Sequence, residues 1–100
     1  MNRRRLKIIE PAELELQDIY DYYEAESTNL GRLFINEFRR GVNRILQFPQ
    51  AWPSIEKNIR KCTLKKFPFH IIYAVTEDLI LILAIAHHRR KPDYWIDRLQ

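Results

Sequence analysis

Residues 84–98 concentrate the side chains that could do chemistry in this 100-residue chain. An apolar run from Leu79 to Ala86 ends in two histidines and three basic residues, His87–Lys91, and Tyr94 and Trp95 follow. A buried strand would therefore deliver imidazole, guanidinium and aromatic groups to one edge of a sheet. Such groups can hold a phosphate or contact a macromolecular target, whereas in the plainer interpretation they only form a solvated loop.

The sequence predicts neither a metal site nor a cofactor. His87 and His88 are neighbours in a predicted strand, so their side chains point to opposite faces and cannot bind one ion together. No other cluster has the ligand types and spacing of a zinc site. Cys62 is the only cysteine, which excludes an intrachain disulfide and fits a protein of the reducing cytoplasm.

The charge is distributed unevenly along the chain. The net charge is +4, and residues 57–100 hold nine bases and four acids, whereas residues 10–26 hold seven acids and no base. We therefore expect the helical half to be acidic on its outer face and the later half to attract an anionic partner. No segment approaches the roughly 20 apolar residues that span a membrane, so no membrane association is expected.

Apolar spacing and turn residues predict an α+β fold within one domain, residues 1–100. Glu10-Pro11 begins a first helix, and Ser27–Asn29 is expected to break the chain and cap a second helix that ends at Phe48-Pro49. The expected strands are residues 6–9, 58–64, 69–76 and 79–87, with a loop at 50–56 and a short helix or loosely packed tail at 93–99. In this fold, an N-terminal strand and an antiparallel two-helix hairpin pack with a small, twisted, mainly antiparallel sheet.

Short motifs occur in a fixed order along nearly the whole chain. They are Pro11-Ala12, Asp18-Ile19-x-x-Tyr22-Tyr23, Leu30-Gly31, Phe34 with Glu37, Ile45-x-x-Phe48-Pro49, Ile59-Arg60, Phe67-Pro68-Phe69-x-Ile71-x-Tyr73, and Ala84-Ile85-Ala86-His87-x-x-Arg90-x-Pro92-x-Tyr94-Trp95-x-x-Arg98. In this order, in a basic chain of this length, they resemble the RelE/ParE superfamily of toxins from bacterial type II toxin–antitoxin systems.

The resemblance implies a cytoplasmic toxin that inhibits growth and is neutralised by a cognate antitoxin. RelE-like members cut messenger RNA on the ribosome, whereas ParE-like members poison DNA gyrase and have no known catalytic centre. The sequence favours ribosome-dependent cleavage because basic and aromatic groups converge in the predicted fold, with gyrase inhibition as the alternative. A non-toxic nucleic-acid-binding module and an inactive family member are further alternatives.

For cleavage, the resemblance implies a catalytic set of Arg60, His88 and Tyr94. Arg60 lies in the strand where RelE-like enzymes carry a phosphate-binding arginine, and Tyr94 aligns with their C-terminal tyrosine. His88 stands where a known pattern has arginine, and its ordinary pKa of about 6.5 suits a general acid or base. His70 is expected to face solvent. Five further residues are expected to bind nucleic acid or the target: Lys61, Lys65, Lys66, Arg89 and Arg90.

The antitoxin is expected to be an extended, acidic segment drawn to the basic half of the chain. The helical hairpin and an exposed sheet edge are the docking surfaces predicted for it.

Overall fold

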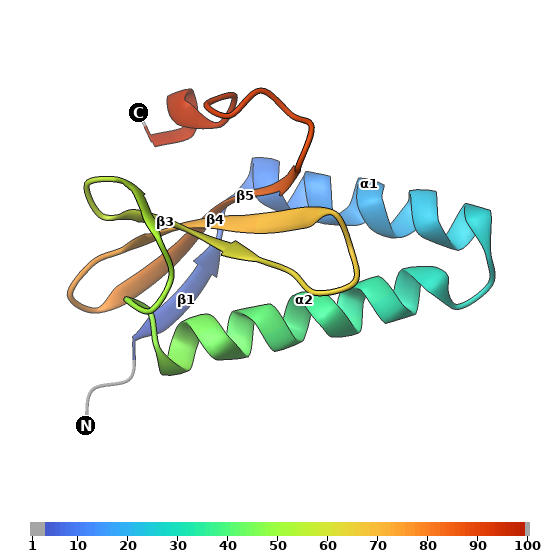
Figure 1. The fold of residues 1–100 in the computed structure, drawn as a ribbon, viewed down its shortest axis with the longest axis horizontal. Coiled ribbons are helices and arrows are strands. Elements are labelled where there is room, and N and C mark those ends of the chain that lie inside the picture. Colours follow the sequence, from blue (N-terminus) through green and yellow to red (C-terminus); the bar gives the residue numbers. More distant parts are fainter. Residues whose placement is uncertain (1–3, 100) are drawn as a thin grey trace.

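The computed structural model describes residues 4–99, and Figure 1 shows their arrangement. The elements are β1 (Arg5–Ile8), α1 (Glu10–Glu26), α2 (Leu30–Gln47), β2 (Ser54–Glu56), β3 (Ile59–Thr63), β4 (Phe69–Val75), β5 (Leu79–His87) and a short 3-10 helix, η1 (Ile96–Leu99). The helical hairpin packs on one face of the sheet, and the C-terminal segment packs on the other. We call these the helix side and the tail side.

The five strands form one mixed sheet in the order β1-β5-β4-β3-β2. β1 runs parallel to β5, and the other neighbours are antiparallel, so the expected α+β architecture is confirmed. β5 is apolar on both faces and lies between β1 and β4, as predicted for an interior strand. The expectation that residues 50–56 form only a loop is wrong, because Ser54–Glu56 pairs with β3. Three exposed residues lack the alternating pattern that would have revealed this strand.

Two apolar clusters sandwich the sheet. On the helix side, Phe34 and Phe38 of α2 pack with Ile71 and Tyr73 of β4. On the tail side, Trp95 packs with residues such as Ile72, as expected for a core tryptophan. Side chains along β4 alternate between the two clusters, whereas in β5 the register shift opposite Ile72 and Tyr73 places the neighbours Leu83 and Ala84 on the same, tail side.

The turn between the helices differs from the expected cap. Asn29 adopts a left-handed conformation with φ of 73°, and neither its side chain nor a preceding hydroxyl caps α2. The Glu24 carboxylate instead accepts hydrogen bonds from the backbone N–H groups of Asn29 and Gly31, both at 3.0 Å. A Cβ on Gly31 would lie 2.8 Å from the Tyr20 carbonyl oxygen, so this close approach of α1 and α2 requires glycine.

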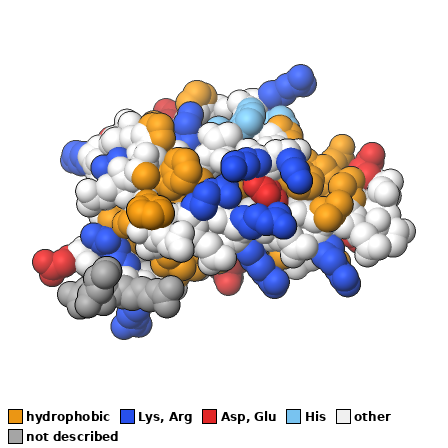
Figure 2. All heavy atoms as spheres, turned by 60° about the horizontal axis from the view of Figure 1, so that its bottom comes forward, with side chains coloured by type: hydrophobic (Ala, Val, Ile, Leu, Met, Phe, Trp, Pro, Cys, Tyr) orange, Lys and Arg blue, Asp and Glu red, His pale blue; other side chains and the backbone are white. Residues whose placement is uncertain are grey.

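The expectation of an acidic outer face holds for α1 but is wrong for α2. α2 carries four arginines and a single acid, Glu37, which is only 3% exposed. Arg39 and Arg40 are exposed on this helix. Figure 2 accordingly shows a face on which basic side chains gather and few acidic ones are visible. Neither helix within residues 4–99 has the length and apolar character needed to cross a bilayer.

Candidate functional site

Arg60 lies on the helix side of β3, paired with Tyr73 of β4. Its guanidinium donates hydrogen bonds to the backbone carbonyl oxygens of Trp52, at 2.7 Å, and Gln50, at 3.3 Å. The Tyr73 hydroxyl donates to the neighbouring Pro49 carbonyl at 2.7 Å. These bonds fasten residues 49–52 to the sheet, so the Arg60 side chain already has a structural role.

Tyr94 lies in the C-terminal segment, and its hydroxyl donates a hydrogen bond of 2.7 Å to Glu15 Oε2 of α1. Burial raises the pKa of Tyr94 above its ordinary range, and the bond to the Glu15 carboxylate raises it further. The Arg90 guanidinium lies over the ring, 3.7 Å from its centroid. At neutral pH this phenol therefore keeps its proton and shares it with a carboxylate.

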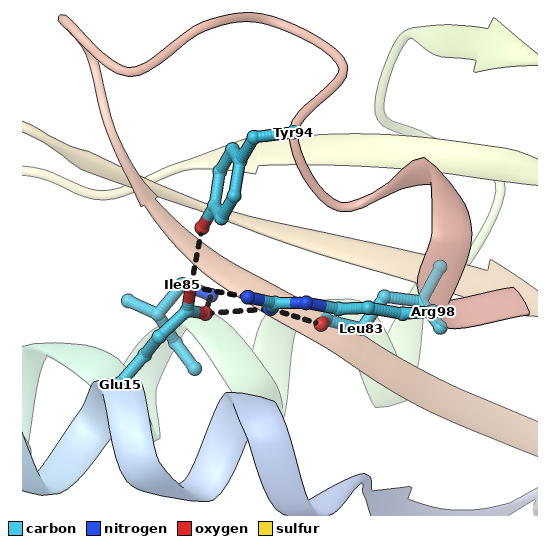
Figure 3. A network of polar contacts seen from close by, with 5 residues as sticks. All are labelled: Glu15, Leu83, Ile85, Tyr94 and Arg98. Carbon is cyan, nitrogen blue, oxygen red and sulfur yellow. Dashed lines mark hydrogen bonds and ion pairs between the residues drawn. The ribbon is translucent and has the colours of Figure 1, made fainter.

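Glu15 is the centre of a polar network that the sequence did not predict (Figure 3). Its two oxygens accept hydrogen bonds of 2.9 and 2.8 Å from the Arg98 guanidinium, and Oε1 also accepts one of 3.0 Å from the Ile85 backbone N–H. Arg98 Nη1 donates in addition to the Leu83 carbonyl at 2.9 Å. The only sequence signal was the presence of Arg98 in the C-terminal motif.

This Glu15 network completes the edge of β5. The pairing of β1 with β5 ends at Ile8 and Ile82, so the backbone of β5 beyond that point lacks a neighbouring strand on this side. Side chains of Glu15 and Arg98 supply the missing acceptor and donor there. The network thus joins α1, β5 and the C-terminal segment at one point.

The histidines lie on both faces of the sheet, as predicted for His87 and His88. His87 packs edge-on against Phe69 on the helix side, and its Nδ1 accepts a hydrogen bond of 3.0 Å from the Arg89 N–H. His88 instead stacks on His70, with centroids 5.1 Å apart and an angle of 19° between the rings. In the part of the chain that the structure describes, no group of three or more histidine, cysteine, aspartate or glutamate residues is placed to hold a metal ion.

His70 is half-buried, so the expectation that it faces solvent is wrong. It lies on the tail side of β4, opposite Thr63 of β3 and next to Lys61. Burial and, to a smaller extent, the nearby charges of Lys61, His88 and His87 together lower the pKa of His70 to about 4. The imidazole is therefore neutral at physiological pH.

Lys65 and Lys66 are exposed in the turn between β3 and β4, which Glu37 holds in place. Glu37 Oε2 accepts a hydrogen bond of 3.0 Å from the Lys65 N–H, and Oε1 lies 3.2 Å from Arg40 Nη1. The buried Glu37 carboxylate therefore fixes the turn that carries the two lysines, and Arg40 neutralises its charge. Arg89 is also exposed.

The structure thus brings some of the predicted residues together and leaves others apart. Lys61 lies beside the stacked histidines, and Arg90 lies on Tyr94. Arg60 is on the helix side, whereas His88 stacks on a residue of the tail side. Within residues 4–99, no hydrogen bond, ion pair or ring contact joins any two of Arg60, His88 and Tyr94.

Comparison with known proteins shows relatives of this chain in sequence and in structure. Two proteins named Toxin ParE2, from the CDC 1551 / Oshkosh and H37Rv strains of Mycobacterium tuberculosis, are each 33% identical to it over 92 residues. The alignments cover 90% of this chain and 87% of each relative. A solved structure titled "Chromosomal ParDE TA system from P. aeruginosa" superposes with a TM-score of 0.74 and 25% identity, over 85% of this chain and 96% of that one.

The family described as "ParE toxin of type II toxin-antitoxin system, parDE" matches residues 6–92. The match extends from β1 through the basic turn after β5, and it confirms the resemblance to the RelE/ParE superfamily. On the extent of this match, the identity to its relatives and the shared fold, the chain belongs to the ParE family of toxins from type II toxin–antitoxin systems.

Proposed function

We propose that this toxin acts in the cytoplasm by inhibiting DNA gyrase, and that it does not cut messenger RNA. Its family implies a cognate antitoxin that neutralises it. The sequence alone favoured cleavage because basic and aromatic residues were expected to converge. Membership of the ParE family, together with the arrangement of those residues, now favours the gyrase alternative.

The observation that carries this proposal is that the three candidate catalytic residues do not share one face of the sheet, because Arg60 lies on the helix side, whereas His88 and Tyr94 contact groups of the tail side. Transfer of an RNA 2′-hydroxyl to the adjacent phosphate needs a base, an acid and a cation around one phosphate group. Here the Arg60 guanidinium binds backbone carbonyls, and the Tyr94 hydroxyl donates to Glu15 with a raised pKa. Two of the three groups are thus already occupied by the fold, which supports a mechanism based on binding alone.

We assign gyrase binding to the exposed basic residues of two turns. Lys65 and Lys66 lie in the β3–β4 turn, and Arg89 lies in the turn after β5. These turns are adjacent, because Phe69 pairs with His87 and the His88 N–H donates to the Pro68 carbonyl. Lys61 and Arg90, which are expected to contribute as well, flank this surface. A cationic surface of this kind fits an acidic region of gyrase or the DNA that gyrase holds.

Induction of the toxin with simultaneous labelling of DNA and protein synthesis tests the proposal. We expect DNA synthesis to stop first, and we expect the purified toxin to inhibit gyrase supercoiling in the absence of ribosomes. Lys65→Glu with Lys66→Glu should weaken this inhibition, whereas the matched change Lys7→Glu on β1 should not.

A different result would restore the cleavage mechanism. If protein synthesis stopped first, messages were cut at the ribosome, and His88→Ala abolished the cutting while the protein stayed folded, the proposal of gyrase inhibition would be wrong.

A further inference from the structure

A diagonal row of four donor side chains crosses three segments on the tail side of the sheet. Thr63 of β3 is paired directly with His70 of β4, so both side chains project from the same face. Lys61 precedes Thr63 by two residues and therefore lies on that face as well. His88 stacks on His70 from the opposite direction, at a centroid distance of 5.1 Å. An ammonium, a hydroxyl and two imidazoles thus lie side by side.

Among residues 4–99, these side chains have no partner of opposite charge. Within the part of the chain that the structure describes, none of the four is hydrogen-bonded or ion-paired through its side chain to another protein group. Lys61 and His70 are partly exposed and Thr63 and His88 are exposed, so a ligand can reach all four side chains from solvent. A row of donors without an acceptor is a suitable environment for an anion.

We propose that Lys61, Thr63, His70 and His88 form a binding site for a phosphate group, of the phosphodiester class found in nucleic-acid backbones. Lys61 supplies a permanent positive charge, and Thr63 supplies a hydroxyl donor. The stacked imidazoles each offer an N–H donor and become cationic when they take up a proton. The site is separate from Arg60, and its existence does not depend on gyrase being the target.

Binding at this site is coupled to protonation of His70. In the free protein, burial, together with the charges of Lys61, His88 and His87, lowers the pKa of His70 to about 4. An anion in the row counteracts these positive charges and favours the imidazolium. By linkage, a bound phosphodiester raises the pKa of His70, and the affinity for that phosphodiester rises as the pH falls.

NMR titration of the three histidine side chains in the full chain tests the proposal directly. The probe is dimethyl phosphate, whose charge stays constant over the titrated range, compared with sodium chloride at the same ionic strength. We expect dimethyl phosphate to raise the pKa of His70, to shift the ring resonances of His88, and to shift those of His87 less. His87 is the comparison residue because its ring packs against Phe69 on the helix side, although its centroid lies 6.4 Å from that of His88, so a smaller response is expected there.

Two variants and a second probe sharpen the test. Lys61→Gln should weaken binding by roughly tenfold, the loss of one charge-assisted contact. The matched change Lys7→Gln on β1, at the far side of the sheet, should not alter binding. A short DNA duplex that shifts the same two histidines at far lower concentration identifies a nucleic-acid backbone as the ligand, whereas a response to dimethyl phosphate alone identifies a site for small phosphates.

The proposal is overturned if dimethyl phosphate shifts none of the histidines, or shifts His87 as much as His70. It is equally overturned if Lys61→Gln binds as tightly as the original protein. Because gyrase is absent from these measurements, they remain decisive even if the toxin proves to have another target.

Discussion

Replacement of Glu15 by alanine tests the network that joins α1, β5 and the C-terminal segment. Glu15 accepts four hydrogen bonds, from Arg98 twice, from Tyr94 and from the Ile85 backbone. The side chains of Glu15 and Arg98 are only 16% and 18% exposed, so water replaces these partners poorly. The variant therefore leaves a partly buried cation, a phenol and a backbone N–H without their acceptor.

The expected loss follows from the energetics of such groups. Breaking a fully buried ion pair costs about 3–5 kcal/mol, and leaving a buried donor unsatisfied costs about 1–3 kcal/mol. Because some solvent reaches this pair, we expect Glu15→Ala to lower the free energy of unfolding by about 3 kcal/mol, near the lower limit for a buried pair. Urea denaturation of the purified chain measures this loss as a shift in the midpoint.

Two controls make the measurement decisive. Glu13→Ala removes an exposed carboxylate from the same helix and should change the free energy of unfolding by less than about 0.5 kcal/mol. The double variant Glu15→Ala/Arg98→Met should lower the free energy of unfolding by less than the sum of the two single changes. The reason is that in Glu15→Ala the guanidinium has already lost its partner. If Glu15→Ala were no more destabilising than Glu13→Ala, or if the two changes were simply additive, the reasoning would be refuted.

Three further changes have expected outcomes. The unfolded chain takes up a proton on His70 near pH 6.5 but the folded chain only near pH 4. The free energy of unfolding should therefore fall by about 1–2 kcal/mol as the pH drops through that range. In His70→Asn, denaturation at several pH values should show a correspondingly smaller decrease of the free energy of unfolding. Glu24→Ala removes the acceptor at the start of α2 and should cost about 1 kcal/mol, with loss of amide-exchange protection at Asn29 and Gly31. Arg60→Ala should lower the free energy of unfolding by about 1–2 kcal/mol, because the carbonyl groups of residues 50 and 52 lose their donor. Gyrase inhibition should stay intact below the melting temperature. Lost inhibition in a folded variant would instead indicate that Arg60 contributes to target binding.

Local patterns predicted those parts of the fold that depend on periodicity. The helical spacing of apolar residues located α1 and α2, and the uniformly apolar stretch of β5 indicated an interior strand. The pattern failed where a structure depends on one polar contact or a very short pairing. The Glu24 carboxylate caps α2 although Ser27 and Asn29 have better capping propensities, and β2 is too short to show alternation.

The candidate site was predicted less completely than the fold. Residue type indicated that Lys61, His88 and Tyr94 could carry function, but not which of them would meet. The partner of Tyr94 is 79 residues away in the sequence, and the stacking of His70 on His88 depends on the register of β4 and β5. Long-range pairings of this kind leave no local signal, because each residue alone resembles an ordinary surface charge.

The Glu15 network also has an evolutionary consequence. Glu15, Tyr94 and Arg98 depend on one another, so substitutions at these three positions should be correlated among related sequences. A lineage that loses the carboxylate at position 15 retains a partly buried guanidinium that is harmful until position 98 changes as well. Related toxins should therefore keep this trio together or replace it together, and intermediates with only one of the two charges should be rare.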